Sequence, residues 1–439
     1  MASVIPFPAA SNPLALLQGQ FVLFKLSGKY WVVDRTELNA VKGGQPNVKV
    51  QFLLTKDARL MLERYLELQP IVSSSKIDIP QFYRDPGTIV YDAVAFSPLP
   101  TPSNTFNYWT GSPINPVAGD WSVIGKFLRW VICGGDINCL NYLLHYLAHM
   151  LQKPEEKPGV IVALLGGEGI GKGTFFRLLR AMFPATTVEI SDVDQVVGKY
   201  NAVLEHNYCI CMDEAVFSGD GKATDRLKSY VTEPTVSIED KFQPRRTIDS
   251  FHRFFAASNH KHFARVSADD RRFVFFRVSG AHQGDLKYWE KVHAAIADSA
   301  CIAAMVHYLL NMDLSAFNIR DRPKTAEHMV QKLQSLSGFD RYWCEILFSG
   351  DLGSVQWSAS CFVSTDTLMH GWQAHNRPVR QFTTAQQRDI AEALERLCPA
   401  AKSRRQQSNG RQERGYQLPT LSDARRAFAA AMGGAIRWP

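Results

Sequence analysis

Short apolar runs alternate with longer amphipathic stretches from residue 160 onward, and five of these runs are candidate β-strands. They are VIVALL at Val160–Leu165, TVEI at Thr187–Ile190, YCICM at Tyr208–Met212, FFAAS at Phe254–Ser258 and FVFFRV at Phe273–Val278. Most of the runs are continuously apolar rather than alternating, which is typical of strands that are covered on both faces. The pattern therefore predicts a parallel five-stranded sheet in an α/β fold.

The residues before this region carry two other patterns. Phe21–Asp34 predicts two strands joined by a Ser-Gly-Lys turn, and Asn47–Leu54 predicts a third, so a small β-containing domain is expected. Several prolines in Pro98–Pro116 indicate a linker. Trp121–Gln152 has apolar residues at helical spacing, interrupted at Gly134-Gly135, which predicts two packed helices.

The residues after the predicted sheet favour helices and one basic β-hairpin. Leu286–Leu314 is helical in pattern, and so are Asp389–Leu397 and Ala424–Met432. Between the last two lies Lys402–Pro419, a basic stretch broken by glycine, which is typical of the wing of a winged-helix domain. Four arginines in this stretch are candidates for contacts with DNA phosphates: Arg404, Arg405, Arg411 and Arg414.

Net charge points to the same end of the chain. The formal charge is +7, and residues 377–439 alone contain 12 Lys and Arg against 5 Asp and Glu. A neutral body with a basic end indicates a polyanionic partner, although a basic solvated surface has the same composition.

No apolar run approaches the ~18 residues of a membrane span. The eight cysteines lack zinc-site spacing. We therefore expect a cytoplasmic protein without a membrane partner.

A glycine-rich loop is the sharpest motif in the chain. GGEGIGKGTFF, residues 166–176, follows a predicted strand and opens a predicted helix. Gly166, Gly169 and Gly171 allow the backbone to wrap closely enough for its N–H groups to point at phosphate oxygens, and the helix N-terminus adds partial positive charge. Lys172 is expected to contact the β- and γ-phosphates of ATP.

Two carboxylates after the third predicted strand complete a candidate site for ATP and Mg²⁺. Asp213 and Glu214 follow YCICM directly. Asp213 is expected to hold magnesium, and Glu214 to orient and deprotonate the attacking water. Gly173 stands where Ser or Thr usually supplies a hydroxyl to the metal. Thr174, one residue later, is therefore a candidate metal ligand, and the alternative is water.

Polar residues also mark the fourth and fifth predicted strands. Asn259 ends the fourth, where its amide would hydrogen-bond the γ-phosphate or position the water, although an ordinary turn asparagine looks the same. Arg271 and Arg272 precede the fifth. At such a boundary an arginine can reach the γ-phosphate of a neighbouring subunit as a finger. The alternative is a structural salt bridge to Asp269 or Asp270.

This order of elements resembles the superfamily 3 helicases, which are AAA+-type motors, and in particular the helicase part of phage and plasmid primase-helicases. The resemblance covers Asn104–Ser279. It implies a homohexameric ring that hydrolyses ATP between subunits and translocates on single-stranded DNA, with primase or other replication proteins as further partners. It also implies a channel hairpin within Leu227–Phe251, where Lys241 and Phe242 would contact phosphate and stack on bases. An ordinary surface hairpin is the alternative.

Pattern and resemblance together predict five segments: an N-terminal accessory domain (1–105), a helical collar (106–155), a P-loop ATPase core (156–285), a helical segment (286–340) and a basic winged-helix-like domain (341–439). The expected function is an ATP-dependent DNA helicase or replication-initiation ATPase of a phage, plasmid or other mobile element. Two alternatives remain. Nucleoside-monophosphate kinases also use GKGT, and a non-catalytic DNA-binding initiator would need only the basic end. Stimulation of ATP hydrolysis by DNA discriminates among them.

Overall fold

Two compact units make up the chain in the computed structural model. The structure describes residues 12–43, 50–69, 79–214, 221–241, 245–260, 262–264, 266–267, 270–352, 356–376, 384–408 and 411–439. The first unit comprises residues 1–215, 225–259 and 278–321. The second comprises residues 216–224, 260–277 and 322–439.

The N-terminal part of the first unit is a small sheet with helices packed on it. The predicted hairpin is confirmed: β1 (Phe21–Leu26) pairs antiparallel with β2 (Lys29–Asp34) across a turn in which Ser27 has a positive φ of 51°. The third predicted strand is shorter than expected, because only β3 (Leu53–Leu54) pairs with β2, and residues 47–49 lie outside the described part. The strand order is β3-β2-β1-β4, with β4 at Val90–Tyr91.

Four helices accompany this sheet: α1 (Pro13–Gln20), α2 (Arg35–Lys42), α3 (Thr55–Glu67) and α4 (Ile79–Arg84). Apolar residues of α1, α3 and α4 and of β1 and β2 form one hydrophobic core. Part of the predicted proline-rich linker is a strand, because β6 (Thr105–Asn107) pairs in parallel with β5 (Ala93–Ala95).

The central sheet of the chain contains all five predicted strands. They are β7 (Ile161–Leu165), β8 (Thr187–Ile190), β9 (Cys209–Met212), β12 (Arg253–Ser258) and β13 (Phe273–Arg277), in the order β13-β7-β12-β9-β8. The pairs β7–β12, β12–β9 and β9–β8 are parallel. Every residue of β7, β9 and β12 is buried, which explains their continuous hydrophobicity. The chain is therefore a mixed α/β protein with a five-stranded parallel sheet.

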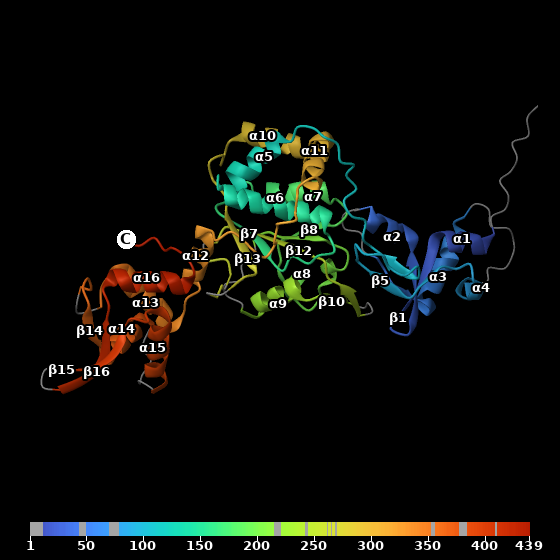
Figure 1. Ribbon diagram of the computed structural model, residues 1–439. Helices are drawn as coiled ribbons and strands as arrows, with labels where there is room; N and C mark the ends of the chain where they lie inside the picture. The colour runs from blue at the N-terminus through green and yellow to red at the C-terminus, as the bar shows by residue number, and fades with distance from the viewer. Residues whose placement is uncertain are drawn as a thin grey trace, which may run out of the picture. The chain divides into compact units, whose positions relative to one another are not determined.

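Helices lie on both sides of this sheet (Figure 1). On one side are α6 (Ile137–Gln152) and α7 (Lys172–Met182), with α10 (Leu286–Ala297) and α11 (Ser299–Leu310) packed on them; on the other are α8 (Asp194–Val197) and α9 (Gly221–Thr232). Among the described residues, no single helix is both long enough and apolar enough to span a membrane. Helices α10 and α11 have the required length and composition only when they are taken together, and a bend of 73° separates them.

The predicted break in the helical region before the sheet is confirmed. The first stretch is α5 (Ser122–Lys126), which continues as the π-helix η1 (Phe127–Ile132). Gly134 and Gly135 then take positive φ values of 57° and 83°, which turns the chain. Asp136 begins the next helix, α6, because its carboxylate accepts hydrogen bonds from the N–H groups of Asn138 and Cys139.

The second unit ends in helices and a long hairpin in the predicted order. Its helices are α12 (Ala326–Gln334), α13 (Gly338–Ser349), α14 (Thr365–Asn376), α15 (Thr384–Leu397) and α16 (Leu421–Met432). Its strands are β14 (Cys361–Ser364), β15 (Lys402–Ser408) and β16 (Arg411–Leu418), which form an antiparallel sheet in the order β14-β16-β15. A hydrophobic core that includes Trp343, Ile390 and Phe428 holds these elements together.

Candidate functional site

The glycine-rich loop joins β7 to α7 in a conformation that only glycine tolerates at two positions. Gly166 has a φ of 154° and Gly171 a φ of 103°. A Cβ at Gly166 would lie 2.5 Å from Cδ1 of Ile170, and a Cβ at Gly171 would clash with the ring of Trp289. The loop is therefore a close-fitting backbone turn at a helix N-terminus, which is the arrangement that cradles phosphate groups. Gly169 also has a positive φ of 67°.

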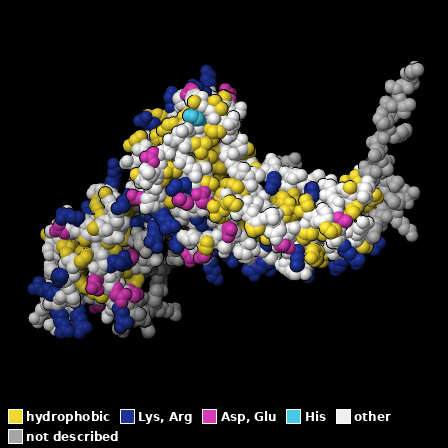
Figure 2. Space-filling view, turned by 45° about the vertical axis from the view of Figure 1, so that its right-hand side comes forward, with side chains coloured by type: hydrophobic (Ala, Val, Ile, Leu, Met, Phe, Trp, Pro, Cys, Tyr) yellow, Lys and Arg dark blue, Asp and Glu magenta, His cyan; other side chains and the backbone are white. Residues whose placement is uncertain are grey.

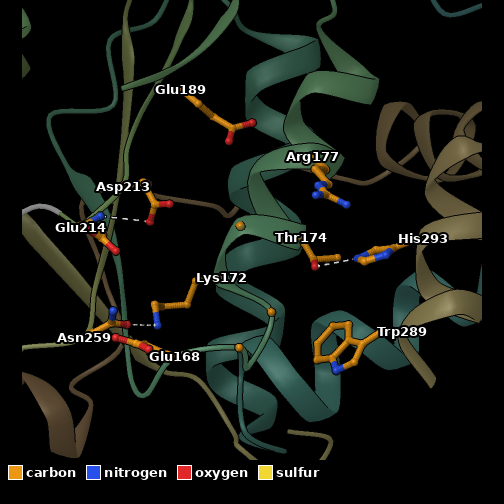
Figure 3. A pocket seen from close by; sticks show the side chains of 13 residues that line it. Glu168, Lys172, Thr174, Arg177, Glu189, Asp213, Glu214, Asn259, Trp289 and His293 are labelled. Carbon is orange, nitrogen blue, oxygen red and sulfur yellow. Dashed lines mark hydrogen bonds between the residues drawn. The ribbon is translucent and has the colours of Figure 1, made fainter. Parts of the chain in front are cut away.

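Lys172 is the first residue of α7, and its side chain is buried in the loop. Its Nζ donates to the carbonyl oxygens of Gly166, at 2.9 Å, and Gly167, and to Oδ1 of Asn259 at 2.6 Å (Figure 3). Burial lowers the pKa of Lys172, and nearby carboxylates, above all Asp213, oppose this effect. Its partners are neutral oxygens, which phosphate oxygens can replace.

Asp213 and Glu214 follow β9 and face the same region as Lys172 and Asn259 (Figure 3). Because β7, β12 and β9 are adjacent and parallel, the loops at their carboxyl ends meet at one edge of the sheet. The backbone N–H of Glu214 donates to Oδ1 of Asp213 at 3.0 Å. Glu214 has a φ of 52°, a left-handed conformation that costs a non-glycine residue on the order of 1 kcal/mol and clusters at functional sites.

The donor set at this edge suits a magnesium ion that arrives with a phosphate ligand. Among the residues that the structure describes, no group of three or more His, Cys, Asp or Glu side chains is placed to hold a metal ion. Magnesium typically takes one or two protein carboxylates and completes its octahedron with water and substrate phosphate oxygens. Asp213, with Glu214 beside it, would supply the carboxylates for such an ion, and the glycine-rich loop would hold the phosphates.

These residues line a cavity of about 560 Å³, a volume in the range of small-molecule sites. Its other end is formed by α7 and α10 (Figure 3). There the hydroxyl of Thr174, predicted as a metal ligand, instead forms a 3.1 Å hydrogen bond with Nε2 of His293 and points away from Asp213. A Cβ at Gly173 would have no atom within 4 Å, so the surrounding structure does not require glycine at this position.

Outside the glycine-rich loop, four residues that line the cavity were not predicted: Arg177, Glu189, Trp289 and His293. Trp289 and His293 are four residues apart on α10 and so share one face of that helix. The sequence contains this spacing, but it does not contain the information that α10 packs beside α7. Glu189 is ion-paired with Arg180 at 3.1 Å.

Arg271 and Arg272 lie just before β13, in the second unit. Arg271 is exposed and Arg272 is half-buried. The carboxylate of Asp270 accepts hydrogen bonds from the backbone N–H groups of Arg272 and Phe273, both at 3.2 Å, and so fixes the chain at the start of the strand. Asp269, the other predicted salt-bridge partner, lies outside the described residues.

A hairpin is present where the resemblance implied one. β10 (Thr235–Ile238) pairs antiparallel with β11 (Arg246–Asp249), and Lys241 lies exposed in the connecting turn. The Nζ of Lys241 lies 5.4 Å from the ring centroid of Tyr200, an aromatic side chain that is 43% exposed. Phe242, the predicted stacking residue, lies outside the described residues.

The predicted basic wing is the β15–β16 hairpin. Arg405 lies directly opposite Arg414, so both side chains project from one face, whereas Arg404 lies opposite Gly415 and projects from the other face. All three arginines are exposed. Arg411 begins β16, and its side chain is outside the described part. Figure 2 shows Lys and Arg side chains gathered at the lower left, where Figure 1 labels β15 and β16. Like charges directly opposite each other destabilise a hairpin, and an anion relieves that repulsion.

Comparison with known proteins supports the fold. Residues 164–272 match a protein family described as a family of unknown function, DUF5906. None of the curated proteins compared with the chain matches it. Two apo structures of the NrS-1 C-terminal region are similar, with TM-scores of 0.62 and 0.60 and 15% and 16% sequence identity. Each alignment covers 93% of this chain and 99% of the other. At such identity the likeness shows a shared fold.

Proposed function

We propose that this chain is an ATP-dependent DNA helicase of the superfamily 3 type, which acts in the replication of a phage, plasmid or other mobile element. The observation that carries the proposal is the meeting of Lys172, the Asp213–Glu214 pair and Asn259 around one cavity, although three different strands supply them. A cation, two carboxylates and an amide at the end of a glycine-rich loop are the groups that ATP hydrolysis requires.

Each group has a defined task in this proposal. Lys172 exchanges its bonds to loop carbonyls for bonds to the β- and γ-phosphate oxygens. Bound magnesium neutralises charge on the phosphates, and Asp213 is the residue that would hold it. Glu214 orients the attacking water and accepts its proton at a carboxylate oxygen. Asn259, released from Lys172, is free to hydrogen-bond the water or the γ-phosphate.

Two further features favour work on nucleic acid rather than phosphate transfer to a small molecule. The β10–β11 hairpin carries an exposed lysine beside an aromatic ring. The β15–β16 hairpin presents two arginines on one face. We infer a homohexameric ring on single-stranded DNA, with the basic β15–β16 hairpin on duplex DNA.

Substitution of two residues tests the ATPase proposal. Lys172→Ala removes the phosphate contact and should weaken nucleotide binding. Glu214→Gln keeps the hydrogen-bonding shape but removes the base, so binding should persist while turnover falls by two orders of magnitude or more, about what a general base contributes. Glu189→Gln is the matched control, because this carboxylate lines the same cavity but is ion-paired with Arg180. Near wild-type turnover by Glu214→Gln would refute the assignment of the base.

The same assay separates the helicase from a nucleoside-monophosphate kinase. Turnover of ATP by the full chain is measured alone, with single-stranded DNA, and with nucleoside monophosphates. A helicase is stimulated by DNA and forms free phosphate, whereas a kinase forms a nucleoside diphosphate from the added monophosphate. Phosphate transfer to a monophosphate without any effect of DNA would contradict the proposal.

A further inference from the structure

The cavity has an aromatic end opposite its carboxylates. Trp289 and His293 project from α10 into this end, and they are the two aromatic side chains among the described residues that line the cavity (Figure 3). Asp213, Glu214 and Asn259 line the opposite end. A ligand whose phosphates bind the glycine-rich loop would therefore place its charged half at the carboxylate end of the cavity. The aromatic end would leave space for a flat, apolar half of the same ligand.

The position of Trp289 is fixed from several sides. Its indole Nε1 donates to the carbonyl oxygen of His282 at 2.8 Å, and its ring meets that of Phe127 edge to face at 6.2 Å. It also occupies the space that a side chain at Gly171 would fill. Gln283 donates to the carbonyl oxygen of Glu168 at 2.9 Å and so ties the chain before α10 to the glycine loop. The ring is thus held rigidly beside the loop.

The charges at this end also suit an uncharged ring with a phosphate beside it. Burial lowers the pKa of His293, and the neighbouring cation of Arg177 lowers it further, which favours the uncharged imidazole. Its Nε2 is engaged by the hydroxyl of Thr174, which lies one helical turn from the exposed Arg177 on α7. Arg177 is the cation at this end, and the phosphate nearest the nucleoside would lie between it and Thr174.

We propose that Trp289, with His293, forms the base-binding half of the site and stacks on the heteroaromatic base of a nucleoside triphosphate. The inference rests on the proposed function and deepens it, because it assigns to α10 the recognition of the nucleoside rather than of the phosphates. Base stacking on an aromatic side chain is tolerant of base identity, so the site distinguishes a nucleotide from a bare polyphosphate more strongly than one base from another.

The test compares two ligands that differ in the nucleoside alone. Binding of a non-hydrolysable ATP analogue and of inorganic tripolyphosphate, each with Mg²⁺, is measured by calorimetry on the full chain. Trp289→Leu should weaken the analogue by roughly ten-fold or more, the order of one base–aromatic stack, and leave tripolyphosphate unchanged. Trp289→Phe should restore much of the analogue's affinity. His293 is half-buried, and His293→Leu should lower the affinity for the analogue by less than Trp289→Leu does and leave the affinity for tripolyphosphate unchanged.

Trp130→Leu is the matched control, because Trp130 lies on η1 in the same unit, is 52% exposed and does not line the cavity. Equal losses for both ligands in Trp289→Leu and Trp289→Phe would mean that the indole only supports the loop, and would overturn the inference. Unchanged affinity for the analogue would overturn it as well. If the wild-type chain binds neither ligand, the proposed nucleotide site itself is wrong. If the wild-type chain binds both ligands and Trp289→Leu binds the analogue with wild-type affinity, the inference about Trp289 is wrong but the proposed nucleotide site stands.

Discussion

Lys172 shows how a single residue is prepared for a ligand. Its ammonium group is buried, yet its bonded partners in the site are two carbonyl oxygens and the amide oxygen of Asn259, which are neutral. A buried cation without a bonded carboxylate is costly, and burial accordingly lowers its pKa. An incoming phosphate supplies the missing negative charge. The strained backbone of Glu214 lies at the same edge of the sheet. Two features that destabilise the folded chain, a buried charge and a left-handed backbone, therefore lie where the chemistry is proposed.

Gly173 yields a prediction at the same scale. A Cβ at this position has open space around it, so serine fits and places a hydroxyl where other phosphate loops offer one to magnesium. Gly173→Ser should lower the Mg²⁺ concentration needed for half-maximal binding of a non-hydrolysable ATP analogue. Gly173→Ala controls for the gain in helix propensity, because it adds the methyl group without the hydroxyl. Identical magnesium titrations for the two variants would show that the serine hydroxyl does not reach the metal.

At the scale of elements, the sheet was predictable from the sequence and the helix packing was not. The run at Val160–Leu165 predicts β7 to within one residue, because burial on both faces is recorded locally as continuous hydrophobicity. The bond between Thr174 and His293 joins residues 119 positions apart, and nothing local records it. The same reason hides Trp289, whose contact with Gly171 depends on where α10 packs. Local sequence patterns therefore predicted the glycine-rich loop and the carboxylates that line the cavity, whereas the residues of α10 reach the cavity through tertiary packing.

The β10–β11 hairpin provides a test of how an element couples to DNA. Lys241 lies in its turn beside Tyr200 and is not among the residues that line the candidate ATP cavity. Lys241→Ala should preserve basal ATP hydrolysis but lose DNA stimulation and unwinding, because it removes a phosphate contact. Lys29→Ala is the control, since Lys29 is an exposed lysine at another hairpin turn, that of β1–β2. Normal unwinding by Lys241→Ala would remove the channel role of this hairpin.

The β15–β16 hairpin makes a second prediction, which concerns salt. Arg405 and Arg414 are exposed on one face, where each can neutralise a DNA phosphate. Their double alanine variant should flatten the dependence of log K on log salt for duplex DNA by about 1.8, at roughly 0.9 per lost contact. The control removes the same charge elsewhere, at Arg396 and Arg426, which are ion-paired with Asp340 and Asp423. Equal slopes for both double variants would leave the hairpin as solvated surface.

At the scale of the whole molecule, the residues predicted for the ATP site are divided between the two compact units. Lys172, the carboxylates and Asn259 belong to the first unit, and Arg271 and Arg272 belong to the second. In the proposed ring, which would hydrolyse ATP between subunits, the first unit of one subunit would supply the loop and the second unit of its neighbour would supply the finger. Such a division would make full hydrolysis a property of the assembly, because the arginine that stabilises the transition state would come from the second unit.

Mixing two inactive variants tests this division. Lys172→Ala lacks the phosphate contact, and the Arg271→Ala/Arg272→Ala double variant lacks the finger, so each alone should be inactive. In mixed rings some interfaces combine an intact loop from one subunit with an intact finger from the other, and ATPase activity should reappear at intermediate ratios. Asp270 holds this segment through backbone N–H groups, so the double substitution should leave the start of β13 folded. Absence of recovery at every ratio, with co-assembly verified by co-purification of differently tagged subunits, would rule out a finger that acts between subunits.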